Sequence, residues 1–499
     1  MVKSASGVFI QPVHDAAGYG VAQWRRVYGA VRSAIDGGAL VAGVRLPSAR
    51  QLAADWRVSR GAVDEAFAQL QLEGLIERRV GDGTYVNALP PALRRQPKPV
   101  AQRVLQRSAV LGCAPARLEA AWTTMRVPPL HPRSTDIDAF PLELWRRLMV
   151  QACDEAQRSL LDGVPPGGLT ALREAITRHL AIHRGVRCAP EQVLVINGPG
   201  EGVQVVARLL LSAGDTVWIE DPSHPSLPLL MRTLGLNVVG VPLDTCGFDV
   251  EAGQRLAPDA KLVYLHPLMQ YPLGQVTHNR RAEQLLAWAR RSGAWIIEGH
   301  FNDETVPPAQ QLPALASNDA SGRVILMGTF EGVMFPSLRV AYLVLPRALA
   351  PAFIGAATGL GERVPAAVQW ALAEFIDRGH MTTHLQAQRA ALFRRRDTVR
   401  ALLLATLPAG VRAGPMNAGT HLCLHLPASV ADTELASALR KQRVMVEPLS
   451  AIAWQAKGLN GLVIGYGAWD GAVLENALRC IAQTLAAACA AYQPSGENA

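Results

Sequence analysis

The chain has 499 residues, of which 49% are hydrophobic and 18% charged, a composition typical of globular proteins. Because single hydrophobic cores stop growing at roughly 250–300 residues, this length predicts more than one domain. We find no apolar run of the roughly 18–20 residues needed to span a bilayer, and no apolar core of a secretory signal near the start. We therefore expect a cytoplasmic protein with no membrane partner.

The cysteines, histidines and net charge bear on whether the chain has disulfides, a metal site or a nucleic-acid partner. The seven cysteines are widely scattered and never form C-x-x-C, which argues against a disulfide framework or a zinc site. His421 and His425 lie four residues apart in a strand-like stretch, where we expect no metal site. The net charge of +8 suits nucleic acid, but a modest positive charge alone is weak evidence.

Residues 15–87 form the first predicted domain. An apolar helical stripe ends at Gly37-Gly38, and "LPSARQLAADW" and "RGAVDEAFAQLQLEG" predict two further helices. The stretch "LIERRVGDGTYV" predicts a hairpin whose turn, Gly81-Asp82-Gly83, needs positive φ. Together these elements predict a small α+β winged helix-turn-helix.

This arrangement suggests contact with double-stranded DNA. The exposed start of the second helix of the motif can enter a major groove, where Arg60 would read guanine or bind phosphate. The wing offers Arg78, Arg79 and Thr84 to the DNA backbone or the minor groove. The alternative is a small helical cap whose arginines are merely solvated.

A basic, Pro-rich linker is predicted over residues 88–127. Such a stretch cannot bury enough apolar surface to hold one structure, so we interpret it as a tether between domains. Its basic residues are Arg94, Arg95, Lys98, Arg103, Arg107 and Arg117.

Residues 128–490 alternate short β-rich runs with amphipathic helical patterns. This alternation predicts an α/β domain with a mainly parallel sheet and helices on both faces. The β-rich runs cover 193–196, 216–220, 261–265, 294–299 and 323–328.

The stretch "RLPSARQLAADWRVSRGAVDEAFAQLQLEGLIERRVGDGTYV" strongly resembles the DNA-binding domain of GntR-family transcription regulators. The resemblance implies operator contacts by its two arginines and its wing. The chain departs from the family at Gly61-Ala62, where a threonine is common, and the acidic pair Asp64 and Glu65 follows. The DNA-binding positions carried over are Arg50, Ser59, Arg60, Arg79, Gly81, Gly83 and Thr84.

The rest of the chain resembles fold-type I aminotransferases, and the fusion to a GntR head resembles the MocR subfamily. "FPLELWRRL", "WIEDPSHPS", "HPLMQYPLG" and "GTFEGVMFPSLRVAYLV" all fall in family order. The resemblance implies a homodimer, a smaller C-terminal α+β subdomain, and pyridoxal phosphate (PLP) as the family cofactor.

Four positions that the family uses for PLP chemistry have changed. The aldimine lysine, which must supply the amine of the Schiff base, becomes Gly332. The acid that pairs with the pyridine nitrogen becomes Gly299, and the tyrosine that bonds the cofactor oxygen becomes Phe301. The arginine that grips a substrate carboxylate becomes Val463. We therefore expect no covalently bound cofactor and no transaminase activity.

Some polar positions remain for a ligand, which would be a small anionic effector. The candidate pocket residues are Arg339 at the phosphate-binding position, Gln270, Gly198, His224 at the ring-stacking position, and His300. The lysines at positions 3, 98, 261, 441 and 457 do not fall in a loop that the family points at the cofactor.

The alternatives left open are noncovalent PLP binding through Arg339, a PLP-dependent aminotransferase with a DNA-binding head, and an architectural domain without ligand.

Overall fold

The computed structural model describes residues 2–3, 9–10, 22–88, 128–360, 363–416 and 419–491. The chain divides into two compact units, residues 1–108 and 109–499, and each is described by itself. Nearly all of the expected tether, 88–127, lies outside the described residues. Within the described ranges, no helix combines the length and apolar character that crossing a bilayer requires. The same ranges contain no group of three or more His, Cys, Asp or Glu that could hold a metal ion.

The first unit is a winged helix-turn-helix, as the sequence predicts. Its helices surround a small apolar core that includes Val31, Leu52 and Phe67. Three of its strands form an antiparallel sheet in the order β3-β5-β4, and the short strands β1 (Val2–Lys3) and β2 (Phe9–Ile10) pair with each other. The elements are α1 (Gln23–Asp36), β3 (Arg45–Leu46), α2 (Ala49–Trp56), α3 (Arg60–Leu72), β4 (Ile76–Arg79) and β5 (Gly83–Val86).

Two serines set the start of the second and third helices. The Oγ of Ser48 accepts a hydrogen bond from the backbone N–H of Gln51 at 3.2 Å. The Oγ of Ser59 accepts from the backbone N–H of Ala62, also at 3.2 Å. Both bonds satisfy helix-start donors that would otherwise lack an intrahelical partner. Arg57, with φ of 52°, ends α2 in the left-handed conformation and makes the tight turn between the helices.

The larger lobe of the second unit is built on an eight-stranded sheet in the order β6-β13-β12-β11-β10-β7-β8-β9. The five strands from β12 to β8 in this order pair in parallel, and β13 is antiparallel to both of its neighbours. The strands are β6 (Val193–Ile196), β7 (Thr216–Asp221), β8 (Asn237–Asp244), β9 (Gly247–Phe248), β10 (Leu262–Leu265), β11 (Trp295–His300), β12 (Val324–Thr329) and β13 (Ala341–Val344). The predicted mainly parallel sheet is confirmed.

Helices cover both faces of this sheet. Alternate residues of a strand point to opposite faces, and β6 shows the result: Val193 and Val195 pack into one core, Leu194 and Ile196 into another. The main covering helices are α4 (Leu142–Gln151), α5 (Thr170–Arg184), α6 (Pro199–Leu210), α7 (Ser226–Thr233), α8 (Val250–Leu256), α9 (Asn279–Ser292), α10 (Leu315–Asn318), α11 (Ala350–Leu360) and α12 (Ala366–Asp377).

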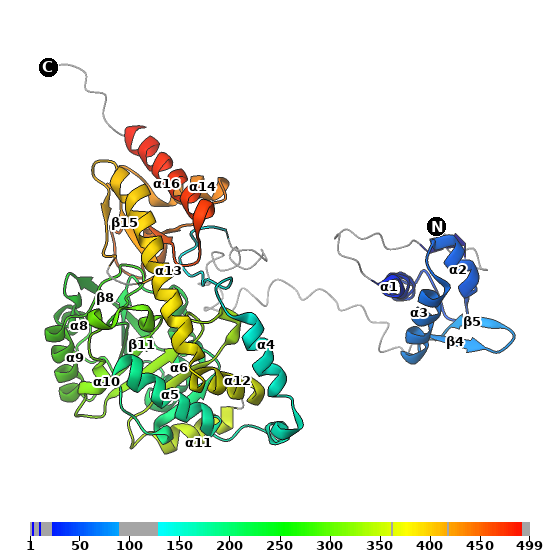
Figure 1. The fold of residues 1–499 in the computed structure, drawn as a ribbon, viewed down its shortest axis with the longest axis horizontal. Helices are drawn as coiled ribbons and strands as arrows, with labels where there is room; N and C mark the ends of the chain where they lie inside the picture. The colour runs from blue at the N-terminus through cyan, green and yellow to red at the C-terminus, as the bar shows by residue number, and fades with distance from the viewer. Residues whose placement is uncertain are drawn as a thin grey trace. The chain divides into compact units, whose positions relative to one another are not determined.

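A smaller lobe follows, built on a four-stranded antiparallel sheet in the order β14-β15-β17-β16. Its elements are β14 (Arg412–Ala413), β15 (His421–His425), α14 (Asp432–Lys441), β16 (Glu447–Pro448), α15 (Leu449–Ile452), β17 (Gly461–Gly465) and α16 (Gly471–Ala491). The long helix α13 (His380–Leu402) runs from the larger lobe into the smaller one (Figure 1).

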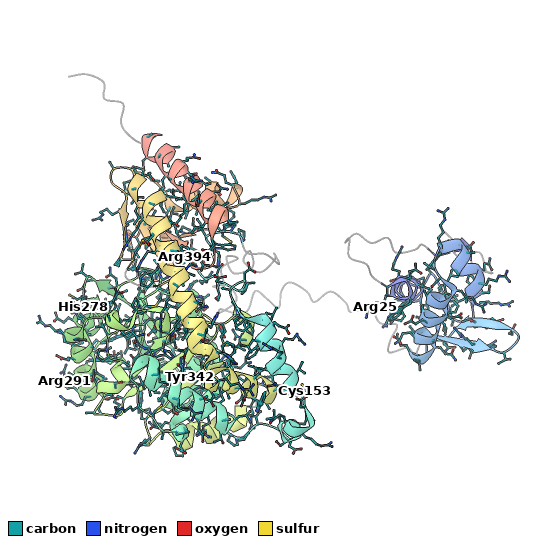
Figure 2. The ribbon with its side chains drawn as sticks, in the orientation of Figure 1. Arg25, Cys153, His278, Arg291, Tyr342 and Arg394 are labelled. Carbon is teal, nitrogen blue, oxygen red and sulfur yellow. The ribbon has the colours of Figure 1, made fainter. Side chains whose placement is uncertain are left out.

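The two halves of α13 belong to different cores. Met381 and Leu385 pack in the core of the larger lobe. Val399 and Leu403, at the other end of the helix, pack in the core of the smaller lobe. Figure 2 shows Arg394 on this helix and Tyr342 of β13 inside the larger lobe, where Tyr342 is fully buried. One helix therefore ties the two lobes together.

Candidate functional site

The start of α3 presents its arginine to solvent. The side chain of Arg60 is 72% exposed, and its ion pair with Asp64, one turn along the helix, is 3.6 Å long. Arg50 of α2 is exposed as well. Ser59 serves as the cap of α3, so its hydroxyl positions the helix start. Arg50 and Arg60 are thus both open to solvent, and α3 begins where a major-groove helix would contact DNA.

The wing depends on its two glycines. Gly81 and Gly83 have φ values of 78° and 136°, in the left-handed region that favours glycine. A Cβ at position 83 would also lie 2.6 Å from Nε of Arg45. The guanidinium of Arg79 lies 4.5 Å from the ring centroid of Tyr85, which holds it along the wing. Thr84 pairs with Arg78 in the sheet register, so both lie in the body of the hairpin.

Asp64, on α3, connects this helix to the wing. One carboxylate oxygen is 3.6 Å from Nε of Arg60, and the other is 3.6 Å from Nη2 of Arg78. The backbone carbonyl of Asp64 also accepts a hydrogen bond from Arg78. This acid therefore pairs with two exposed arginines, while Glu65 is exposed to solvent.

In the second unit, the position that the resemblance assigns to the aldimine lysine is filled by another side chain. Gly332 lies in the loop after β12, and a Cβ built there would be 1.7 Å from Oδ1 of Asn302. Asn302 follows β11 in the left-handed conformation, with φ of 60°. Any side chain at position 332 therefore requires Asn302 to move.

The position of the pyridine-pairing acid is filled by a histidine. A Cβ at Gly299 would lie 2.6 Å from Cδ2 of His266. Nδ1 of His266 is 3.0 Å from a carboxylate oxygen of Glu220, and its ring centroid is 5.0 Å from that of Phe301. Burial raises the pKa of Glu220, and the hydrogen bond with His266 opposes that rise. An imidazole thus stands where the family has a carboxylate.

The phosphate-binding position contains an ion pair internal to the chain. Nη1 of Arg339 lies 3.6 Å from Oε1 of Glu331. A Cβ at Gly198 would lie 2.9 Å both from Nη2 of Arg339 and from Oε1 of Glu331. Burial raises the pKa of Glu331, and Arg339 opposes that rise. The carboxylate of Glu331 therefore shares this place with the arginine.

The ring-stacking position is engaged by an arginine. Nε2 of His224 is 3.0 Å from Nη1 of Arg133. Arg133 also pairs with Glu447 of the smaller lobe, and Glu447 accepts a hydrogen bond from the hydroxyl of Tyr271. Burial, together with the charge of Arg133, lowers the pKa of His224 to about 3. This network links the two lobes.

Gln270 supports the loop in which it lies. Its buried amide donates to the carbonyl oxygen of Pro222 at 2.7 Å and accepts from the backbone N–H of Leu273 at 3.0 Å. Val463 is fully buried against Leu449. Apolar packing therefore replaces the arginine that would hold a substrate carboxylate.

His300 lies on the opposite side of β11 from His266. Gly299 and Phe301 both lie beside His266, and because strand residues alternate in direction, His300 faces the other side. There its Nε2 is 3.1 Å from Glu298, and Arg184 donates to its Nδ1 at 3.4 Å. The structure therefore separates His300 from the other candidate pocket residues.

The residues present do not fit PLP. Asn302 stands at the lysine position, His266 at the acid position and Glu331 beside the phosphate-binding arginine. An amide and an imidazole thus replace the amine and the acid that would hold the cofactor, and a carboxylate stands where its phosphate would pair with Arg339. We therefore derive no chemical step through PLP.

Sequence reasoning missed most of these filling groups. Glu331 gave a usable signal, because an acid next to a phosphate-binding motif suggests an internal partner for Arg339. Arg133 and Glu447 gave none, because they are 314 residues apart along the chain.

Two known families match the chain. The gntR family of bacterial regulatory proteins matches residues 23–86. The aminotransferase class I and II family matches residues 136–462.

Curated relatives match this chain over most of its length and of their own. The probable rhizopine catabolism regulatory protein MocR of Rhizobium meliloti is 32% identical, over 89% of this chain and 90% of its own length. The HTH-type pyridoxine biosynthesis transcriptional regulator PdxR of Corynebacterium glutamicum is 31% identical, over 88% and 91%. The HTH-type transcriptional regulator TauR of Rhodobacter capsulatus is 29% identical, over 81% and 84%.

Solved aminotransferases share the fold of the second unit. LysN, the alpha-aminoadipate aminotransferase of Thermus thermophilus, superposes with a TM-score of 0.67 at 22% identity, covering 78% of this chain and 97% of its own. An archaeal alanine:glyoxylate aminotransferase gives 0.69 at 21% identity, covering 78% and 98%. At these identities the likeness shows the fold alone.

The predicted fold and family are thus confirmed. The chain belongs to the MocR subfamily of GntR-family transcription regulators, in which a winged helix-turn-helix is joined to an aminotransferase class I/II domain.

Proposed function

We propose that this protein regulates transcription by binding operator DNA through α3 and the wing, while its aminotransferase-like domain has lost covalent PLP binding and transamination. Exposed arginines on the first unit support the DNA-binding part. The observation that carries the rest is at Gly332, where Asn302 takes the space that a lysine would need. In this proposal the second unit acts as a regulatory and dimerisation domain.

Dimerisation follows from the resemblance to aminotransferases. A two-fold dimer would offer two heads to paired half-sites, whose spacing depends on the reach of the chain between the units. The double-stranded operator is the macromolecular partner in this scheme, and the protein acts in the cytoplasm. Any effector would be a small molecule that biases the spacing of the two heads.

The DNA-binding part is tested after genome-wide occupancy mapping has supplied the operator. Arg60→Ala should then weaken operator affinity by about 10- to 100-fold, the loss of one base-reading arginine. Arg103→Ala, in the basic stretch outside the described residues, is the matched control and should cost far less. Equal small losses for both variants would contradict recognition by α3.

The loss of covalent PLP is tested by spectroscopy. The purified full chain is incubated with PLP and examined for an aldimine band that borohydride removes. We expect no such band. A clear band would contradict the proposal and would favour a PLP-dependent aminotransferase with a DNA-binding head.

A second candidate is a regulator that still senses a pyridoxine vitamer without a covalent bond. The observation favouring it is the similarity to a relative named as a pyridoxine biosynthesis regulator. Stabilisation of the wild-type chain by PLP, without an aldimine band, would support it.

A further inference from the structure

We infer that the carboxylate of Glu331 takes the place of a ligand phosphate. It pairs with Arg339 beside Gly198 and so excludes phosphate-bearing ligands from this site. This inference rests on the proposed loss of covalent PLP binding. It goes further, because it also excludes noncovalent binding through a phosphate group.

The surroundings of Glu331 favour an anion. Helix α6 begins at Pro199, directly after Gly198, and has 12 residues. The start of a helix carries a partial positive charge and free N–H groups. The guanidinium of Arg339 lies against the same glycine. A helix start and an arginine together would attract phosphate if no carboxylate were already present.

Glu331 already occupies this place. Its side chain is 20% exposed, against 56% for Arg339, so the carboxylate is the deeper member of the pair. The backbone N–H of Glu331 donates to Oγ1 of Thr329 at 3.2 Å, which fixes the start of the loop. A Cβ built at Gly198 would lie 2.9 Å from Oε1 of Glu331, so the carboxylate lies close to the start of α6.

A tethered carboxylate has two advantages over a free anion. It is attached to the chain, so its effective concentration is about millimolar or higher, and a free ligand must compete with it. A phosphate placed beside it would also meet a second negative charge in a half-buried site, where the repulsion is stronger than in water. Both effects oppose the binding of any ligand whose phosphate group would pair with Arg339.

The neighbouring positions reinforce this exclusion. Asn302 fills the space at Gly332, and His266 fills the space at Gly299. A ligand that kept the family's contacts would therefore meet an amide and an imidazole where the family has a lysine and an acid. Removing Glu331 alone should restore only the place for a phosphate, so inorganic phosphate is the appropriate probe.

The experiment measures binding of inorganic phosphate to the full chain by calorimetry and by thermal shift. The variants are Glu331→Ser and Glu331→Gln, each alone and combined with Arg339→Ala. We expect both single variants to bind phosphate at least about tenfold more tightly than the wild type, because one repelling charge is gone. Arg339→Ala should cancel that gain. Glu331→Gln keeps the side-chain shape and provides the measurement if Glu331→Ser does not fold.

Two controls make the result specific. Glu374→Gln removes a carboxylate from an exposed ion pair with Arg378 elsewhere in the unit and should leave phosphate binding unchanged. With the Glu331 variants, PLP should gain affinity and pyridoxal, which lacks the phosphate, should not.

Wild-type binding as tight as that of the Glu331 variants would overturn the inference, and so would a gain that survives Arg339→Ala. Failure here is distinct from failure of the proposed function. An aldimine band in the wild type would contradict the proposed loss of covalent PLP, whereas phosphate binding without that band would contradict only the role of Glu331.

Discussion

The winged helix and the site around Arg339 both carry an arginine at a position that matches a family motif. The two arginines differ in the carboxylate with which each is paired. Arg60 is mostly exposed, and its 3.6 Å pair with Asp64 faces water. Such exposed pairs contribute about 0–1 kcal/mol, so they exchange readily for DNA phosphates. In the cleft, Arg339 pairs with the half-buried carboxylate of Glu331. A retained arginine therefore indicates binding only when its charge is available.

The largest expected effect is a difference between the two units in how their free energy of unfolding depends on pH. Burial lowers the pKa of His421 to about 4, and the pKa values of His183 and His224 are also lowered, to about 4 and about 3. Their stabilising contribution is present above about pH 6.5, the unfolded value, and is lost as the pH falls toward the folded values. For His421 alone this is about 2 kcal/mol at pH 5.

Residues 22–88, which form the winged helix-turn-helix, contain no histidine, so this domain supplies the matched control. Unfolding of the second unit, followed by denaturant titration, should become easier between pH 7 and pH 5, while the first unit should change little. For the second unit, His421→Gln should reduce the slope of the free energy of unfolding plotted against pH. A slope that this substitution leaves unchanged would show that the buried histidine does not cause it.

Gly332→Lys tests whether the cleft is filled. Because Asn302 occupies the space beside position 332, the lysine should lower the free energy of unfolding by about 1–3 kcal/mol, the usual cost of overpacking. Adding Asn302→Ala should recover most of that loss. Denaturant unfolding of the single and double variants measures both effects. A single variant as stable as the wild type would show that Asn302 does not fill the space beside position 332.

Arg133→Ala tests the network between the lobes. It leaves Glu447 with Tyr271 but without its arginine, and should lower the free energy of unfolding by about 1–2 kcal/mol. Arg146→Ala breaks an exposed pair with Glu143 and should change the free energy of unfolding by no more than about 0.5 kcal/mol. Similar losses in the two variants would mean that the network is no stronger than a surface pair.

The smallest expected effect is on DNA binding. Asp64→Asn frees Arg60 and Arg78 from a competing carboxylate and should raise operator affinity a few-fold, which is about 1 kcal/mol or less, in low salt. Glu65→Gln removes the neighbouring charge and serves as the control for general repulsion of DNA. Fluorescence anisotropy over a salt series compares them; an equal gain from both would exclude a specific role for Asp64.

Much of the fold could be predicted from the sequence, because buried parallel strands are short apolar runs. The runs at β6, β7, β10, β11 and β12 gave the core of the sheet. Strand β8 was missed because Gly240 and Pro242 interrupt its apolar pattern. Strand β13 was missed because it follows the loop at 330–339 so closely that we interpreted the two as one segment.

The site was less predictable than the fold. Motif order located Gly332, Gly299 and Arg339, but it could not show what fills the space beside them. His266 approaches Gly299 from another strand, and no local pattern encodes that contact. His300 could have been placed correctly, because strand alternation already puts it on the opposite face from Gly299.

The helix α13 has a mechanical consequence. With 23 residues it is about 35 Å long, and its ends are embedded in two different cores. The backbone N–H groups of Trp454, Gln455 and Ala456 also bind the carboxylate of Asp221 in the larger lobe. Relative movement of the two lobes would therefore require α13 to bend, or one of its ends to leave the core in which it packs.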